Sequence, residues 1–218
     1  MAQNESINTI SDLSDTWSLN NSGTYYRAMN PTPGTGIALA NTTAFSDTAC
    51  SILIRNTSAS SANGPQIFLD YIKLIWTAAG TGALAVDFCH VIDPNNRYTS
   101  GGTQLTGLSS NTGFASGGAS NPSVADIRVG AIVSSAAVAK RQLGRERVQQ
   151  GINLGNVWVM NYGQATMEAQ TTNAVLVGMR SGPVMLGPGG NHSYLLHCWA
   201  VGQSSAPSFE VEVGYWEF

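Results

Sequence analysis

The chain has 218 residues and a net charge of −3, and only 11% of its residues are charged, against about 25% in an ordinary soluble domain. This slightly negative net charge gives no indication of the basic face that nucleic-acid binding requires. No apolar run approaches the roughly 18 residues of a membrane span. The first six residues lack the basic and apolar regions of a signal peptide, so we expect the protein to be made in a cytoplasm.

The first 46 residues predict an irregular N-terminal arm. The segment is polar, and the run Asn30-Pro31-Thr32-Pro33-Gly34 interrupts any regular element. Such an arm could wrap a neighbouring subunit. The alternatives are a frayed terminus and an edge strand that folds back onto the domain.

Residues 47–218 predict one all-β domain, a jelly roll or β-sandwich. β-branched and aromatic runs recur at short spacing between Gly, Pro and Asn turns. The Gly- and Ser-rich segment 99–123 predicts a long loop, and 133–150 favours a short helix. The expected strands are 50–55, 66–76, 83–91, 127–133, 156–162, 174–179, 183–186, 193–200 and 208–216.

The cysteines and histidines do not predict a metal centre. Cys50, Cys89 and Cys198 are an odd number and lie in apolar runs, which is typical of buried reduced thiols. A zinc site could combine His90 and His197 with a neighbouring cysteine. However, adjacent residues of a strand point to opposite faces, and the sequence has no CxxC or HxxxH spacing. We therefore expect neither a metal nor another cofactor.

The sequence also predicts no catalytic residues. It has no Gly-x-Ser-x-Gly nucleophile motif. Asp70, Asp87, Glu210 and Glu212 could supply the two carboxylates of a glycoside-cleaving jelly roll. Glu210 and Glu212 alternate with apolar residues, a pattern typical of a solvated or interface-facing sheet edge. We therefore expect a protein that is not an enzyme, with glycoside cleavage as an open alternative.

Four of the ten basic residues fall within one short segment: Lys140, Arg141, Arg145 and Arg147. In a chain so poor in charge, this concentration predicts an electrostatic contact with an acidic neighbouring subunit, in preference to nucleic acid or a phosphate surface. A solvated loop or helix face is the alternative. Trp216, near the end of the last expected strand, could dock into a neighbour or hold that strand in place. These five residues are the candidate partner interface.

Tryptophans at strand positions suggest a second class of function. An exposed aromatic row that binds carbohydrate could contain Trp76, Trp158, Trp199, Tyr215 and Trp216, although such residues more often lie in the core. An exposed row would indicate a carbohydrate-binding β-sandwich for host attachment, as a tail or fibre component.

The C-terminal third resembles a known class of protein. The turn-containing segment GPVMLGPGG at 182–190 precedes the strand-like segments SYLLHCW at 193–199 and SFEVEVGYWE at 208–217. Together they are similar to the ending of tailed-phage virion proteins of jelly-roll type that decorate, or cement, the capsid surface. The resemblance implies a homotrimer on the virion surface that binds the major capsid protein and stabilises the mature shell. It implies no cofactor.

Overall fold

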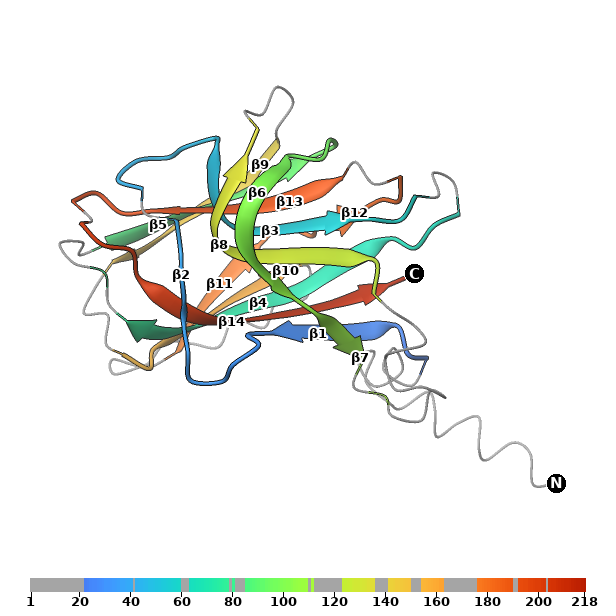
Figure 1. The fold of residues 1–218 in the computed structure, drawn as a ribbon, viewed down its shortest axis with the longest axis horizontal. Coiled ribbons are helices and arrows are strands. Elements are labelled where there is room, and N and C mark those ends of the chain that lie inside the picture. The colour runs from blue at the N-terminus through green and yellow to red at the C-terminus, as the bar shows by residue number, and fades with distance from the viewer. Residues whose placement is uncertain are drawn as a thin grey trace.

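The computed structural model describes residues 22–40, 42–59, 63–78, 80, 85–109, 111, 123–135, 141–149, 154–162, 176–189, 192–202 and 204–218. Within these ranges the regular elements are all strands, arranged in two sheets that pack against each other (Figure 1). The described residues therefore include no helix that could cross a membrane.

Sheet A has eight strands, six of them in the order β11-β10-β4-β14-β1-β7. The pair β10–β11 is parallel and the other pairs are antiparallel. Two short strands add to it, β12 beside β4 and β2 beside β14. The bounds are β1 Tyr25–Met29, β2 Ile37–Ala38, β4 Ile67–Ala78, β7 Gly107–Ser109, β10 Val157–Tyr162, β11 Leu176–Ser181, β12 Met185–Leu186 and β14 Ser208–Glu217.

Sheet B has six strands in the order β6-β8-β3-β13-β5-β9, all in antiparallel pairs. Strand β6 continues almost directly into β7, so this part of the chain passes from sheet B to sheet A along one side of the sandwich (Figure 1). The bounds are β3 Ala49–Asn56, β5 Ala85–Asp93, β6 Tyr98–Leu105, β8 Ala125–Ser134, β9 Arg141–Gln149 and β13 Ser193–Trp199.

Eight of these strands pair in the order of a jelly roll. The first pairs with the last (β1·β14), the second with the seventh (β3·β13), the third with the sixth (β4·β10) and the fourth with the fifth (β5·β9). The four pairs alternate between the sheets, which places β1-β14-β4-β10 in sheet A and β3-β13-β5-β9 in sheet B. The expected all-β sandwich is confirmed, with jelly-roll strand pairing.

An aromatic cluster joins the two sheets in the core. Trp76 and Trp158 of sheet A lie with their ring centroids 5.1 Å apart, and the Phe209 ring is 4.8 Å from Trp76. Phe88 of sheet B contacts Trp158 at 5.5 Å. All four residues are buried. Edge-to-face aromatic pairs of this kind add to the stability that burial alone provides.

The predicted arm at 1–46 is wrong for its second half. Residues 1–21 lie outside the described residues, but β1 pairs with both β14 and β7. Tyr26 and Ala28 point into the core, while Arg27 and Met29 are exposed. Because β1 has only five residues, its alternation was too short to stand out beside the Pro- and Gly-rich segment that follows it.

Two other expected elements are corrected. Most of the described part of the predicted loop 99–123 forms β6 and β7, while residues 110 and 112–122 lie outside the described residues. Gly101 and Gly102 in β6 adopt φ values of 83° and 73°, which side-chain-bearing residues rarely adopt. The predicted helix at 133–150 is wrong, since strand β9 and the end of β8 occupy its described part. Pairing of β9 with β5 outweighs the helical preference of the Arg, Gln, Leu and Glu residues in β9. Residues 136–140 lie outside the described residues.

Candidate functional site

The described part of the predicted basic cluster lies on β9, an edge strand of sheet B. The backbone groups along one side of such a strand are available to pair with another chain. Arg145 and Arg147 lie opposite Cys89 and Asp87 of β5, whereas Arg141 lies beyond a register shift in the same pair of strands. The structure therefore brings two of the four predicted basic residues together. Lys140 lies outside the described residues.

Arg145 and Arg147 converge on the buried carboxylate of Asp87. Arg147 donates two hydrogen bonds, from Nε to Oδ1 and from Nη2 to Oδ2, both at 2.9 Å, and Arg145 Nη2 donates to Oδ1 at 3.0 Å. Burial alone would raise the pKa of Asp87, but these hydrogen bonds and the two positive charges hold that pKa below its ordinary value. The cluster of two arginines and one carboxylate carries a net charge of about +1.

An aromatic pair lies next to this ion cluster. The guanidinium carbon of Arg145 is 5.2 Å from the ring centroid of Trp199, within the range of a cation–π contact. Phe45 meets Trp199 edge-on at 5.6 Å. Between these rings and β9 lies a cavity of about 440 Å³, which we call the edge cavity; it is lined by Phe45, Cys89, Gln142, Leu143, Gly144, Arg145 and Trp199.

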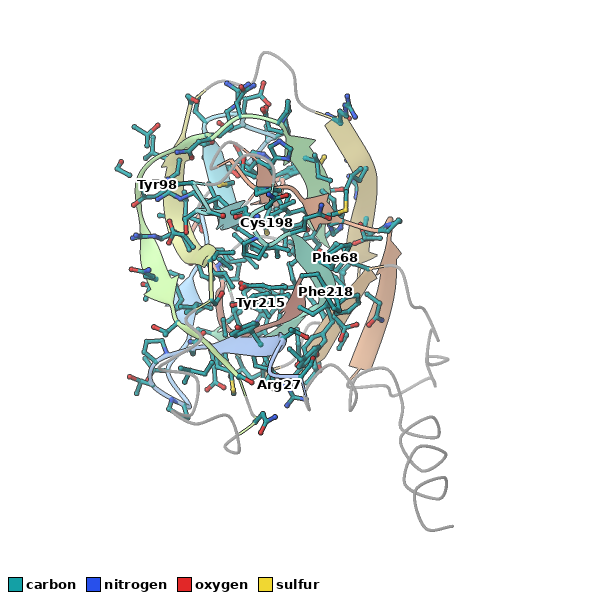
Figure 2. The ribbon with its side chains drawn as sticks, turned by 90° about the vertical axis from the view of Figure 1, so that its right-hand side faces the viewer. Arg27, Phe68, Tyr98, Cys198, Tyr215 and Phe218 are labelled. Carbon is teal, nitrogen blue, oxygen red and sulfur yellow. The ribbon has the colours of Figure 1, made fainter. Side chains whose placement is uncertain are left out.

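The other predicted interface residue, Trp216, lies on the opposite side of the sandwich. Its ring stacks on Phe68 at 6.0 Å, and Phe218 meets Phe68 edge-on at the same distance. Figure 2 shows Phe68 and Phe218 together, across the molecule from Tyr98, which belongs to sheet B. Trp216 is thus separate from the arginines, so the predicted interface residues form two surfaces rather than one.

Polar side chains fill the middle of this outer face of sheet A. Tyr25 donates to Asp70 at 2.8 Å, and both Lys73, at 2.7 Å, and Tyr71 donate to Glu212. Burial raises the pKa of Asp70, whereas the partners of Glu212 outweigh its burial and lower its pKa. We call the outer surface of sheet A around these five residues the open face.

The Glu210–Glu212 pair does not lie at a sheet edge as predicted. Strand β14 lies between β4 and β1, so it is an inner strand of sheet A. Glu212 is engaged by Lys73 and Tyr71, while Glu210 accepts a hydrogen bond from the backbone of Gly34. These contacts give both carboxylates a role in holding neighbouring segments together.

His90 belongs to a buried polar chain inside the sandwich. Its Nε2 is 2.9 Å from Glu146 and its Nδ1 is 2.7 Å from the hydroxyl of Tyr194, which also bonds to the hydroxyl of Tyr162. Burial raises the pKa of both tyrosines. His90 itself is fully buried, so this network satisfies buried polar groups and links the two sheets.

The structure separates the residues considered for zinc. Cys89 and His197 are cross-strand partners on the outer side of sheet B, whereas His90 faces the interior. The Nδ1 atom of His197 lies 3.0 Å from the carbonyl oxygen of Ala49. Within the described residues, no three His, Cys, Asp or Glu side chains form a group that could hold a metal ion.

Sequence reasoning missed the partners that make the arginine cluster a site. From the sequence, Asp87 is a candidate only for a catalytic carboxylate, and Phe45 falls within the predicted arm. The alternation of Arg145 and Arg147 in a strand places both on one face, a signal that the helix prediction obscured. The exposed fractions of Trp76, Trp158, Trp199 and Tyr215 are all 7% or less, so these residues do not form the predicted exposed aromatic row.

Comparisons with known proteins add no functional information. No family model and no curated protein matches the chain. Among solved structures, one weak match is CorA of Methylomicrobium album BG8, described as a surface-associated copper-binding protein important in copper acquisition. It is 12% identical over 82% of this chain and 98% of CorA, with a TM-score of 0.18. A likeness this weak carries no argument about fold or function.

Proposed function

We propose that the protein is a non-enzymatic structural component of a virus particle. In this role it decorates the surface of a tailed-phage capsid, binds the major capsid protein and stabilises the mature shell. The jelly-roll strand pairing carries the proposal, because viral capsid proteins commonly use this architecture. Lectins and cupins use it too, and a fold alone does not determine a function.

The open face gives a second line of support. Four apolar side chains around it, Met29, Leu108, Met185 and Phe218, are each more than half exposed. Met29 and Leu108 flank Arg27 and Glu212 in the strand register, and Met185 and Phe218 lie beside Phe68. Apolar side chains gathered on one face commonly mark a protein–protein contact. A second copy of the chain in a homotrimer would cover them.

The first test is the oligomeric state of the full chain, measured by light scattering over a range of concentrations. We expect a homotrimer. The double variant Leu108→Glu, Met185→Glu should be monomeric and still folded, with the far-UV circular dichroism spectrum of the parent, because both side chains face solvent in the isolated chain. Val201→Glu is the matched control, since Val201 is also exposed but lies in the turn after β13. A full chain that stays monomeric at high concentration contradicts this assembly.

The second test concerns the capsid itself. Co-sedimentation with shells of the major capsid protein from the same virus should show stronger binding to mature shells than to unexpanded ones. A decoration protein stabilises the state for which it has the higher affinity. Failure to bind either form would exclude the proposed role. A truncated chain in this assay should begin at residue 22, because removal of residues 1–46 would delete β1.

A further inference from the structure

The outer side of sheet B contains the same arrangement of side chains twice. In the first, Asp126 accepts hydrogen bonds from Arg55 at 2.7 Å and Arg128 at 2.9 Å. Both guanidinium carbons lie 5.0 Å from the ring centroid of Tyr98. In the second, Asp87 is held by Arg145 and Arg147 beside Trp199, as described above. Each is a carboxylate held by two arginines next to an aromatic ring.

The two clusters differ in how far their arginines are covered. The side chains of Arg55 and Arg128 are 22% and 23% exposed, whereas those of Arg145 and Arg147 are 59% and 50% exposed. The arginines of the first cluster are therefore largely covered by other residues of the same chain. The second has the same chemistry but borders the edge cavity. The cluster around Asp87 is therefore the one with room for a ligand.

The dimensions and lining of the edge cavity fit a small ligand. Its volume of about 440 Å³ falls within the range of known ligand sites. Phe45 and Trp199 provide an aromatic wall, and Cys89 of β5 contributes to the lining between that wall and β9. Gln142 and Arg145 of β9 contribute polar groups to the same lining. A ligand with one apolar surface and several polar substituents would match these side chains.

The charge of the cluster favours an anion. Arg145 gives one hydrogen bond to Asp87, and its guanidinium has further N–H donors that bond to none of the other described residues. A guanidinium group binds a carboxylate through two parallel hydrogen bonds. The amide of Gln142 can both donate and accept, which suits hydroxyl groups.

We propose that the edge cavity binds an acidic saccharide. The carboxylate of the sugar bonds to Arg145, its hydroxyls bond to Gln142, and the apolar side of its ring packs against Phe45 and the edge of Trp199. This site is independent of the particle role, since a decoration protein and an attachment module could both carry it. It differs from the aromatic row considered from the sequence, because recognition rests on Arg145 and a cavity.

Isothermal titration calorimetry with four probes tests the ligand class. N-acetylneuraminic acid and galacturonic acid carry both a sugar ring and a carboxylate, galactose lacks the charge, and benzoate lacks the sugar hydroxyls. We expect either acidic sugar to bind at least about tenfold more tightly than galactose or benzoate, from the strength of charge-assisted hydrogen bonds. Equal binding of galactose or benzoate, or no binding of any probe at millimolar concentration, overturns the proposal.

Matched variants test the place of binding. Arg145→Gln should weaken binding of the acidic sugar about tenfold or more. Arg147→Gln also removes one positive charge beside Asp87, but Arg147 does not line the cavity. This variant should change affinity less than about threefold. Arg128→Gln, in the covered cluster, should have no effect on binding. Unchanged affinity in Arg145→Gln places binding elsewhere and overturns the proposal.

A change in fold must be separated from a change in binding. Each variant is first compared with the parent chain by its melting temperature. If Arg145→Gln melts substantially lower, Gln142→Ala replaces it, because Gln142 lines the cavity and is exposed. That variant should weaken binding about threefold or more, the loss of one hydrogen bond. Unchanged affinity in Gln142→Ala would likewise overturn the proposal.

Discussion

The outer faces of the two sheets differ in what covers them. On the outer side of sheet B, buried residues form a second apolar cluster, and Phe45 and Tyr98 pack against it. The buried members of this cluster are Cys50, Leu53, Cys89, Val91, Ile132, Leu195 and Trp199. On sheet A, the corresponding positions hold the half-buried polar network of the open face. The central strands of sheet B are therefore buried on both sides, and those of sheet A on one side only.

This difference is visible in the burial of single strands. All seven residues of β13, in the middle of sheet B, are buried. In β14, in the middle of sheet A, buried residues alternate with partly exposed ones along most of the strand. A strand covered on both faces has a continuous apolar run, while a strand covered on one face alternates. Position on the outer side of a sheet is thus not equivalent to exposure.

The sharpest test of this difference compares two valines on the outer faces. Val91 of sheet B is 1% exposed, whereas Val159 of sheet A is partly exposed. Val91→Ala should lower the free energy of unfolding by about 2 kcal/mol, because it removes buried methyl groups and leaves a cavity. Val159→Ala should cost less than about 1 kcal/mol. Urea denaturation of both variants gives the values, and equal losses would contradict the distinction.

A second pair of variants tests how tightly the open face is packed. A Cβ atom at Gly214 would lie 2.3 Å from the Tyr71 ring and 2.8 Å from the Tyr25 hydroxyl. Gly214→Ala should therefore displace both tyrosines from their carboxylates and cost about 1–2 kcal/mol. At Gly144 in β9 a Cβ would meet no atom within 4 Å, so Gly144→Ala should stay within about 0.5 kcal/mol.

Thermal denaturation of the two glycine variants provides the comparison. A Gly214→Ala variant as stable as the parent would mean that the tyrosines move aside without loss. In that case the polar network contributes little to the stability of sheet A.

The Asp87 cluster of sheet B predicts that stability depends on pH. Because the folded-state pKa of Asp87 is lowered from about 3.9 in the unfolded chain, its contribution is complete above about pH 5. The contribution is lost as the pH falls below about 4, through the folded pKa. Asp87→Asn should cost about 1 kcal/mol at pH 7, a modest value since both arginines are half exposed.

Urea midpoints of the parent and of Asp87→Asn between pH 7 and pH 2.5 measure this effect. The two curves should lie apart at neutral pH and converge in acid. A constant separation down to pH 2.5 would show that the carboxylate charge of Asp87 is not the source of the difference.

The last prediction concerns the reactivity of the buried thiols and involves no change in stability. Burial raises the pKa of Cys50 and of Cys198 to about 12. At pH 8 neither thiol should react with iodoacetamide in the folded protein. Mass spectrometry of peptides after native and denatured labelling locates the modified cysteines. Rapid native labelling of Cys198 would contradict its place in the core.

The sequence predicted most of the fold because its long strands carry strong patterns. The segments 50–55, 156–162, 193–200 and 208–216 all correspond to observed strands. Failures came where the local pattern is weak. Strand β1 is short, β6 contains adjacent glycines, and β9 has a composition that suits a helix. In each case pairing with a strand distant in sequence decides the conformation, and a local pattern does not contain that information.

The candidate site was predicted only in part for the same reason. The basic segment was recognised from its charge, but Asp87 and Trp199 reach it through β5 and β13, far away in the chain. Phe45 comes from the segment before β3. No spacing rule connects these residues. Their proximity follows from the order of strands in sheet B, which becomes known only with the jelly-roll pairing.

Strand β14 has a consequence for how the chain folds. It follows every other strand in the sequence, yet it lies between β4 and β1 in sheet A (Figure 1). During synthesis, the edges of β4 and β1 that pair with β14 therefore stay open until residues 208–217 leave the ribosome. Folds built from such distant pairings form slowly, and open strand edges promote aggregation in the meantime. A chain that ends before residue 208 would expose two unpaired strand edges, those of β4 and β1, where the complete chain has a continuous sheet.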